Sequence, residues 1–152
     1  MQAIILAAGM GKRLGELTRE NTKCMVKVRE QTLIERMIRQ LSESNVKRII
    51  IVVGYKGEKV KALIGNKINN TPILYIENKI YDKTNNIYSL YLAKDFLIED
   101  ETLLLESDLI FADSILEKLI ADPYPNLAVV AKYQSWMDGT VVTLDEDNNI
   151  LN

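Results

Sequence analysis

Continuous apolar runs alternate along the chain with segments whose apolar residues recur every three or four positions. The runs are short, rich in β-branched residues and bounded by glycine, proline or polar residues, which predicts buried strands. The three-to-four spacing predicts helices that bury one face. The predicted strands are residues 3–7, 48–53, 73–77, 102–105, 127–132 and 140–144. The predicted helices are 32–44, 58–64, 86–97 and 112–121, and the sequence DEDNN at 145–149 predicts a turn.

This alternation predicts the fold class. Strands that alternate with helices favour an α/β, Rossmann-like fold, with a mostly parallel sheet and helices on both faces. No repeat, linker or low-complexity tract divides the chain, so we expect residues 1–152 to form a single domain. In such sheets, ligands bind beyond the carboxyl ends of the strands. The segment after the first predicted strand is therefore the first candidate for a site.

Charge is unevenly distributed along the chain. The net charge of the whole chain is −2, yet six cationic residues and only two acidic ones lie between Lys12 and Arg29. A local basic segment on a weakly acidic chain favours a small anionic ligand and argues against nucleic acid. No apolar run reaches the ~18 residues of a membrane helix, so we expect no membrane partner. The single cysteine, Cys24, is typical of a reducing, cytoplasmic location.

The chain contains no histidine. This excludes histidine as a general base, as a member of a catalytic triad and as a metal ligand. A phosphate or phosphonate acceptor, with a second pKa of roughly 6 to 7, is largely ionised at neutral pH and needs no general base. Transfer to such an acceptor depends on cations, metal and positioning, so it is compatible with this composition.

The basic segment begins with LAAGMGKR, from Leu6 to Arg13. A Walker loop would need glycine at Leu6 and a hydroxyl residue at Arg13, so that motif is excluded. A dinucleotide fingerprint would need a third glycine at Leu14, so it is excluded too. A solvated turn and a different phosphate loop both remain open from the residues alone.

The pattern LAAGxGxR, followed by Lys23, resembles the signature of nucleotidyltransferases that activate sugar phosphates and related phosphates. The segments ENTKCMVKV and NNIYSLYL are most similar to the cytidylyltransferases that act on phosphocholine or 2-aminoethylphosphonate. The resemblance spans the chain and departs at Thr22, where the family has proline, a change that loosens the local backbone. It implies transfer of CMP from CTP, release of pyrophosphate and Mg²⁺ as cofactor.

The resemblance also implies which residues bind the nucleotide. Glycines let backbone N–H groups close around a triphosphate, and arginine offers a planar fork for phosphate oxygens. We expect Arg13 and Lys23 to be catalytic, holding phosphate charge. The nucleotide-binding residues implied are Leu6, Ala8, Gly9, Gly11, Lys12, Arg13, Asn86 and Ser89.

A metal site is expected where LLLESDLIF ends a predicted buried strand. Glu106 and Asp108 stand at i and i+2, on one side of the chain. Asp108 matches the metal-binding aspartate of the family, and Mg²⁺ prefers such oxygen ligands. A solvated loop acid is the alternative, with more weight for Glu106. Relatives supply a second metal-binding aspartate from later strands, so we expect a chain that is truncated or shortened at its carboxyl end.

Three further residues are expected to contact the amine of the acceptor. The resemblance places Asp82 near it, and Trp136 with Asp138 could face an ammonium group, because the face of a tryptophan attracts cations. A surface or dimer contact is the alternative for Trp136. Asn85 and Asn86 precede a predicted helix, and we expect one of them to cap it.

These observations predict a CTP-dependent cytidylyltransferase acting on an amino-alcohol phosphate or aminophosphonate. The alternatives are a sugar-1-phosphate nucleotidyltransferase and, from another class, a non-catalytic nucleotide-binding fragment. The partners expected are the two small-molecule substrates, and an exposed strand edge at the carboxyl end would favour a homodimer.

Overall fold

The computed structural model describes residues 1–137 and 139–151, with the side chains of Lys12, Arg13 and Leu17 left aside. The chain divides into two compact units, Met1–Ala121 and Asp122–Asn152. The first unit holds the helices and the sheets described below. In the described part of the chain, no helix is both long and apolar enough to cross a membrane.

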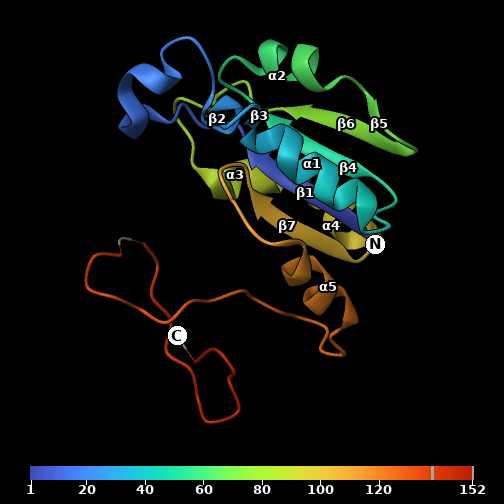
Figure 1. The fold of residues 1–152 in the computed structure, drawn as a ribbon, viewed down its shortest axis with the longest axis vertical. Helices are drawn as coiled ribbons and strands as arrows, with labels where there is room; N and C mark the ends of the chain where they lie inside the picture. The colour runs from blue at the N-terminus through green and yellow to red at the C-terminus, as the bar shows by residue number, and fades with distance from the viewer. Residues whose placement is uncertain (138, 152) are drawn as a thin grey trace. The chain divides into compact units, whose positions relative to one another are not determined.

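A five-stranded sheet in the order β5-β6-β4-β1-β7 forms the centre of the first unit (Figure 1). The strands β6, β4, β1 and β7 run parallel, and only β5 is antiparallel to its neighbour. The mostly parallel α/β sheet predicted from the sequence is confirmed. Its strands are β1 (Gln2–Ala7), β4 (Ile49–Val53), β5 (Lys67–Ile68), β6 (Thr71–Glu77) and β7 (Thr102–Glu106).

Helices pack on both faces of this sheet. One core joins alternate residues of β1, β4 and β7 to α1 (Leu33–Glu43), α2 (Gly57–Ile64) and α5 (Asp113–Ala121). The intervening residues of β1 and β4 face a second core with α3 (Asn86–Leu92) and α4 (Lys94–Glu99). Because both faces are covered, β1 and β4 are buried along their whole length, which explains their continuous apolar sequence.

Local signals set the ends of the predicted helices. Thr32 caps α1, where its hydroxyl accepts from the Glu35 backbone N–H at 3.2 Å. The Glu35 carboxylate accepts in return from the Thr32 backbone N–H at 3.0 Å, which completes a capping box. Gly65, with φ of 72°, ends α2 as its position predicts.

Three predicted elements are wrong, and the strand at 102–105, predicted to be buried, is instead an edge strand in which Leu104 is 49% exposed. The single helix predicted over 86–97 is two helices, because Ala93 turns out of helical geometry (φ −95°, ψ 9°) between α3 and α4. Residues 127–132 and 140–144, all of them described, form no strand apart from one bridge between Leu144 and Ile150. Strand propensity alone is insufficient there, because a strand needs a hydrogen-bonded neighbour.

The predicted turn is confirmed, since Asp145 accepts from the backbone N–H groups of Asp147 and Asn149.

The sequence reasoning missed five short elements. Two of them lie between the first strand and α1 as 3₁₀ helices, η1 (Lys12–Thr18) and η2 (Lys23–Met25). The others are a small hairpin of β2 (Lys27–Val28) and β3 (Gln31–Thr32), and β5. Such elements are too short to show a hydrophobic period.

Candidate functional site

The parallel strands end together at one edge of the sheet. Leu6 pairs with both Val52 and Glu106, and Val53 pairs with Glu77, so the segments that follow these strands are neighbours. These segments contain the glycine loop after β1, the turn after β4, the loop 78–85 after β6 and the acidic segment after β7. The edge predicted to hold a ligand therefore gathers most of the predicted site residues.

Lys23 and Asp108 form an ion pair at this edge. Their side chains are about one-third exposed, so the pair remains open to solvent and to a ligand. Lys23 begins η2, and Asp108 follows β7 by two residues. The structure thus joins the two charged groups that the sequence assigned separately to phosphate and to metal.

Gly11 explains how the glycine loop comes this close to Lys23. Its φ of 63° lies in the left-handed region, and a Cβ placed there would be 2.9 Å from the Lys23 Cβ. The Thr18 hydroxyl donates to the Gly11 carbonyl at 3.1 Å and closes the loop. A residue with a side chain at Gly11 would push η2 away and disturb the ion pair.

The glycine loop is held from the other side by the turn after β4. The Tyr55 backbone N–H donates to the Ala8 carbonyl at 3.1 Å. Gly54 packs closely against Ala8, because a Cβ built at Gly54 would lie 2.8 Å from the Ala8 carbonyl oxygen. Lys12 and Arg13, predicted to bind the nucleotide, have side chains outside the described part of the structure, so their roles stay predictions.

Thr22 stands where the resemblance leads us to expect proline. Its backbone, with φ −86° and ψ 163°, is extended and close to the conformation that proline favours. Its hydroxyl lies 3.0 Å from the Cys24 sulfur, and both residues are buried. Burial raises the pKa of the Cys24 thiol, while the Thr22 hydroxyl opposes that rise. The Thr22 side chain thus makes a buried contact that proline could not make.

Glu106 has a specific partner at this edge. The Asn86 side-chain amide donates to the Glu106 Oε1 at 2.8 Å, which joins the start of α3 to the end of β7. Partial burial raises the pKa of the Glu106 carboxyl, and the nearby Asp108 acts in the same direction, while the Asn86 amide and Lys23 oppose it. The Glu106 carboxylate therefore makes a specific contact at this edge of the sheet.

Asn78 is a buried polar residue at this edge that the sequence reasoning missed. It is 1% exposed, and its amide donates to the Thr84 hydroxyl at 3.0 Å and to the Ser89 hydroxyl at 3.1 Å. Its carbonyl oxygen accepts from the Ile80 backbone N–H at 3.1 Å. Asn78 therefore ties the loop 78–85 to α3. Its only signal in the sequence is its position directly after a strand.

Two other residues considered from the sequence lie on this loop and on the helix that follows it. Asp82 is exposed on the loop, while Ser89, predicted to bind the nucleotide, lies in α3, where it is buried and bonded to Asn78. Asn85 is the N-cap of α3, but its side chain makes no capping bond to the described residues. One of the two asparagines thus occupies the N-cap position, as expected, and the other, Asn86, donates to Glu106.

The predicted acceptor residues near the carboxyl end belong to the second unit. Trp136 is 74% exposed there, and its indole N–H donates to the Gln134 side chain at 2.8 Å. Asp138 lies outside the described residues. The assignment of both to the acceptor's amine stays a prediction.

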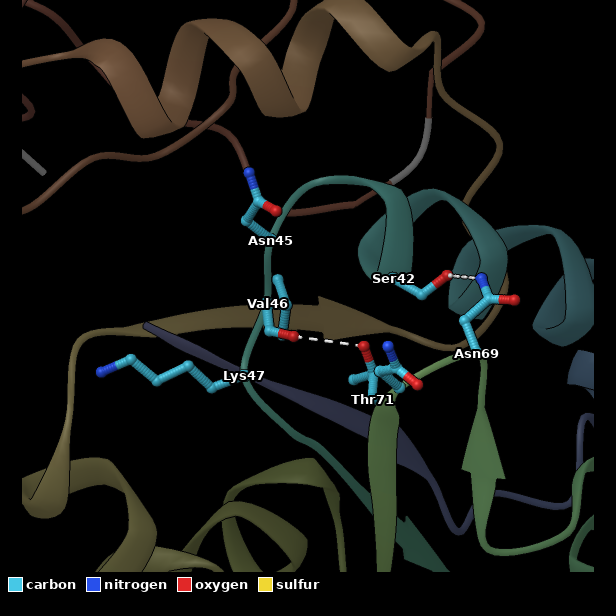
Figure 2. Close-up of a pocket in the computed structure, with 7 residues that line it drawn as sticks. Ser42, Asn45, Val46, Lys47, Asn69 and Thr71 are labelled. Atoms are coloured by element: carbon cyan, nitrogen blue, oxygen red, sulfur yellow. Dashed lines mark hydrogen bonds between the residues drawn. The ribbon is translucent and has the colours of Figure 1, made fainter.

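A cavity of about 370 Å³ lies elsewhere in the first unit, where α1 ends and where β4 and β6 begin. Figure 2 shows Asn69 donating to Ser42 and Thr71 donating to the Val46 carbonyl, so these polar groups satisfy one another. Lys47 extends away from them and pairs with Asp100 at 3.4 Å. The cavity lies at the opposite end of the strands from the candidate site.

Comparisons with known proteins show the family to which the chain belongs. A family model described as a MobA-like NTP transferase domain matches residues 3–142. CTP:phosphoglutamine cytidylyltransferase of Campylobacter jejuni is 35% identical over 143 residues, which are 90% of this chain and 54% of that protein. The 2-aminoethylphosphonate cytidylyltransferase of Lancefieldella rimae is 32% identical over 151 residues, which are 98% of this chain and 58% of that protein.

A solved structure shows the same fold. The CTP:phosphocholine cytidylyltransferase of Streptococcus pneumoniae aligns with a TM-score of 0.59 and 38% identity, over 70% of this chain and 44% of that one. The resemblance inferred from the glycine loop is thereby confirmed. The chain spans a little over half the length of the two cytidylyltransferases compared above.

Proposed function

The chain belongs to the MobA-like NTP transferase domain family, and from that premise we propose that it transfers CMP from CTP to an amino-bearing phosphate or phosphonate. The products are a CDP-linked amino alcohol, or the corresponding CMP-phosphonate, and pyrophosphate. The names of the relatives support the donor and the class of acceptor. They leave the individual acceptor open, with phosphocholine and 2-aminoethylphosphonate as the two candidates.

The observation that carries the proposal is the Lys23–Asp108 ion pair beside the glycine loop. The loop offers backbone N–H groups and open space for a triphosphate, because no described atom lies within 4 Å of a Cβ built at Gly9. Lys23 can move from the Asp108 carboxylate to a phosphate oxygen without leaving this edge. A positive group held there stabilises the charge that develops as pyrophosphate leaves.

Mg²⁺ is the cofactor that we propose. Asp108 supplies carboxylate oxygens, the type of ligand that Mg²⁺ prefers, and phosphate oxygens of a bound nucleotide complete such sites. The described residues contain no group of three or more metal-binding side chains, so the site fits Mg²⁺ only together with the substrate. When bound, Mg²⁺ screens the negative charge of the phosphates.

The absence of histidine from the sequence agrees with this chemistry. The acceptor oxygen is already ionised, so the protein must align two anions and reduce their repulsion. Asp82, Trp136 and Asp138 are proposed, from the family resemblance, to contact the amine end of the acceptor.

Pyrophosphate release tests the proposal directly. We expect turnover with CTP to exceed that with ATP, GTP or UTP, and amino-bearing acceptors to exceed glucose-1-phosphate. Lys23→Ala should lower kcat by on the order of 10²-fold, whereas Lys67→Ala, an exposed lysine on the edge strand β5, serves as the matched control. A preference for the sugar phosphate would support the alternative substrate class. Absence of turnover with every donor would support a non-catalytic nucleotide-binding fragment.

A further inference from the structure

The contact between Asn86 and Glu106 fixes the direction of one amide at the candidate site. Asn86 is the first residue of α3, Glu106 is the last residue of β7, and the two lie 20 positions apart in the sequence. Figure 1 shows α3 near the carboxyl end of β7. Both residues are accessible to solvent, with Glu106 only partly covered, so the contact is not required to fill the core.

The chemistry of the two groups decides which end of the amide faces Glu106. A carboxylate offers only hydrogen-bond acceptors, so the amide nitrogen must be the atom at 2.8 Å from Oε1. The carbonyl oxygen of Asn86 is then directed away from Glu106. Without this partner, the amide could rotate by half a turn and present its N–H₂ group instead.

We propose that Glu106 is a positioning residue that holds the Asn86 amide so that its carbonyl oxygen accepts a hydrogen bond from a substrate N–H group. This inference rests on the proposed function, which brings both substrates to this edge of the sheet. The Glu106 carboxylate repels phosphate and favours an uncharged or cationic donor, which agrees with an N–H group.

Two substrate groups have this chemistry. The exocyclic amino group of cytosine is one, and uracil presents a carbonyl oxygen at the same position. The primary ammonium of an aminoalkyl phosphate or phosphonate is the other, and a trimethylammonium group has no N–H to donate. Discrimination within each pair of substrates therefore reports which donor Asn86 accepts from.

The test compares Glu106→Ala with two other variants. One loses the contact, and the other restores it with the donor and the acceptor exchanged. Asn86→Asp alone should lose it, because two carboxylates would face each other. The double variant Asn86→Asp, Glu106→Gln should regain it, with the new amide donating and a carboxylate oxygen still directed outward. Asn85→Ala is the matched control, since Asn85 is the exposed neighbour whose side chain leaves the described helix end uncapped.

The first measurement is the affinity for CTP and for UTP in the presence of Mg²⁺, by calorimetry. The second is the KM for a primary-ammonium acceptor and for its trimethylammonium analogue. Each measurement gives a ratio: the affinity for CTP over that for UTP, and the KM for the trimethylammonium analogue over that for the primary-ammonium acceptor. We expect Glu106→Ala to reduce one of these two ratios by about tenfold, since one hydrogen bond is lost. The double variant should restore that ratio, and Asn85→Ala should leave it unchanged.

The possible outcomes distinguish a failure of this inference from a failure of the proposed function. Loss of the nucleotide ratio assigns the donor to cytosine, and loss of the acceptor ratio assigns it to the ammonium. Folded Glu106→Ala protein with both ratios intact overturns the inference, as does an equal loss of affinity for all substrates, which would mean a structural role. Failure of the unaltered chain to bind any nucleotide would instead refute the proposed function itself.

Discussion

Gly54 lies where an added methyl group would meet atoms that cannot move aside. A Cβ built at this position is 2.7 Å from the Tyr81 Cβ and 2.8 Å from the Ala8 carbonyl oxygen. Ordinary van der Waals contacts of a Cβ fall between 3.4 and 4 Å. One of these neighbours is backbone and the other is the first atom of its side chain, so the backbone itself must shift. Overpacking of this kind costs about 1 to 3 kcal/mol, which predicts the loss of stability in Gly54→Ala.

Thermal and chemical unfolding followed by circular dichroism measures this loss. For a domain of this size, each kcal/mol lowers Tm by about 2 to 4 °C, so a fall of roughly 2 to 12 °C is expected. Gly9→Ala is the matched control, because its Cβ meets no described atom within 4 Å and its φ lies outside the left-handed region. That variant should unfold within about 0.5 kcal/mol of the unaltered chain.

The Gly9→Ala and Gly54→Ala variants should also differ in their affinity for CTP. Gly9→Ala places a methyl group in the space that we assign to the triphosphate, so its affinity for CTP should fall while its stability is kept. A Gly54→Ala protein as stable as Gly9→Ala would refute the steric reasoning. A Gly9→Ala protein that binds CTP as tightly as the unaltered chain would refute the location of the triphosphate.

Three further predictions follow from particular side chains. Asp108→Ala should abolish metal-dependent turnover, and joint binding of CTP and Mg²⁺ with unchanged affinity would contradict the assignment. Trp136→Ala should raise the acceptor KM by about 2- to 30-fold with little change for CTP, whereas equal loss for both substrates would assign the indole to packing. Hydrogen bonds from Thr32 lower the pKa of Glu35, so its contribution to stability is complete above the unfolded pKa, near 4.3, and is lost as the pH falls through the folded value. Glu35→Gln should therefore flatten the dependence of unfolding free energy on pH below about 4.5, and an unchanged slope would count against the capping box.

The parts of the fold that depend on local pattern could be predicted from the sequence. The buried strands and the one-sided helices followed from hydrophobic spacing, because burial on one face or two imposes that spacing directly. The edge where the loops of the candidate site gather followed as well, since strands that run parallel must end at one edge. Asp108 could be placed there because it follows a predicted strand, although that strand, β7, lies at the edge of the sheet and is not buried on both faces as predicted.

The predicted strands at 127–132 and 140–144 show where local pattern is insufficient. Their apolar, β-branched sequence favours extended backbone, but a strand exists only when a neighbour accepts and donates its backbone hydrogen bonds. In the described residues of the second unit, the single bridge between Leu144 and Ile150 is the only such pairing. Propensity without a partner therefore left these segments outside any sheet.

The sequence by itself determined the class of fold, the glycine loop and the types of charged group at the site. Only the tertiary structure decided which of these groups contact one another: Lys23 with Asp108, and Asn86 with Glu106. The order β4-β1-β7 places strands side by side that are far apart in the chain, and that order leaves no periodic trace in the sequence. The hydrogen bonds of Asn78 could not be predicted from the sequence either, because a polar residue after a strand gives the same sequence pattern whether it is solvated or buried.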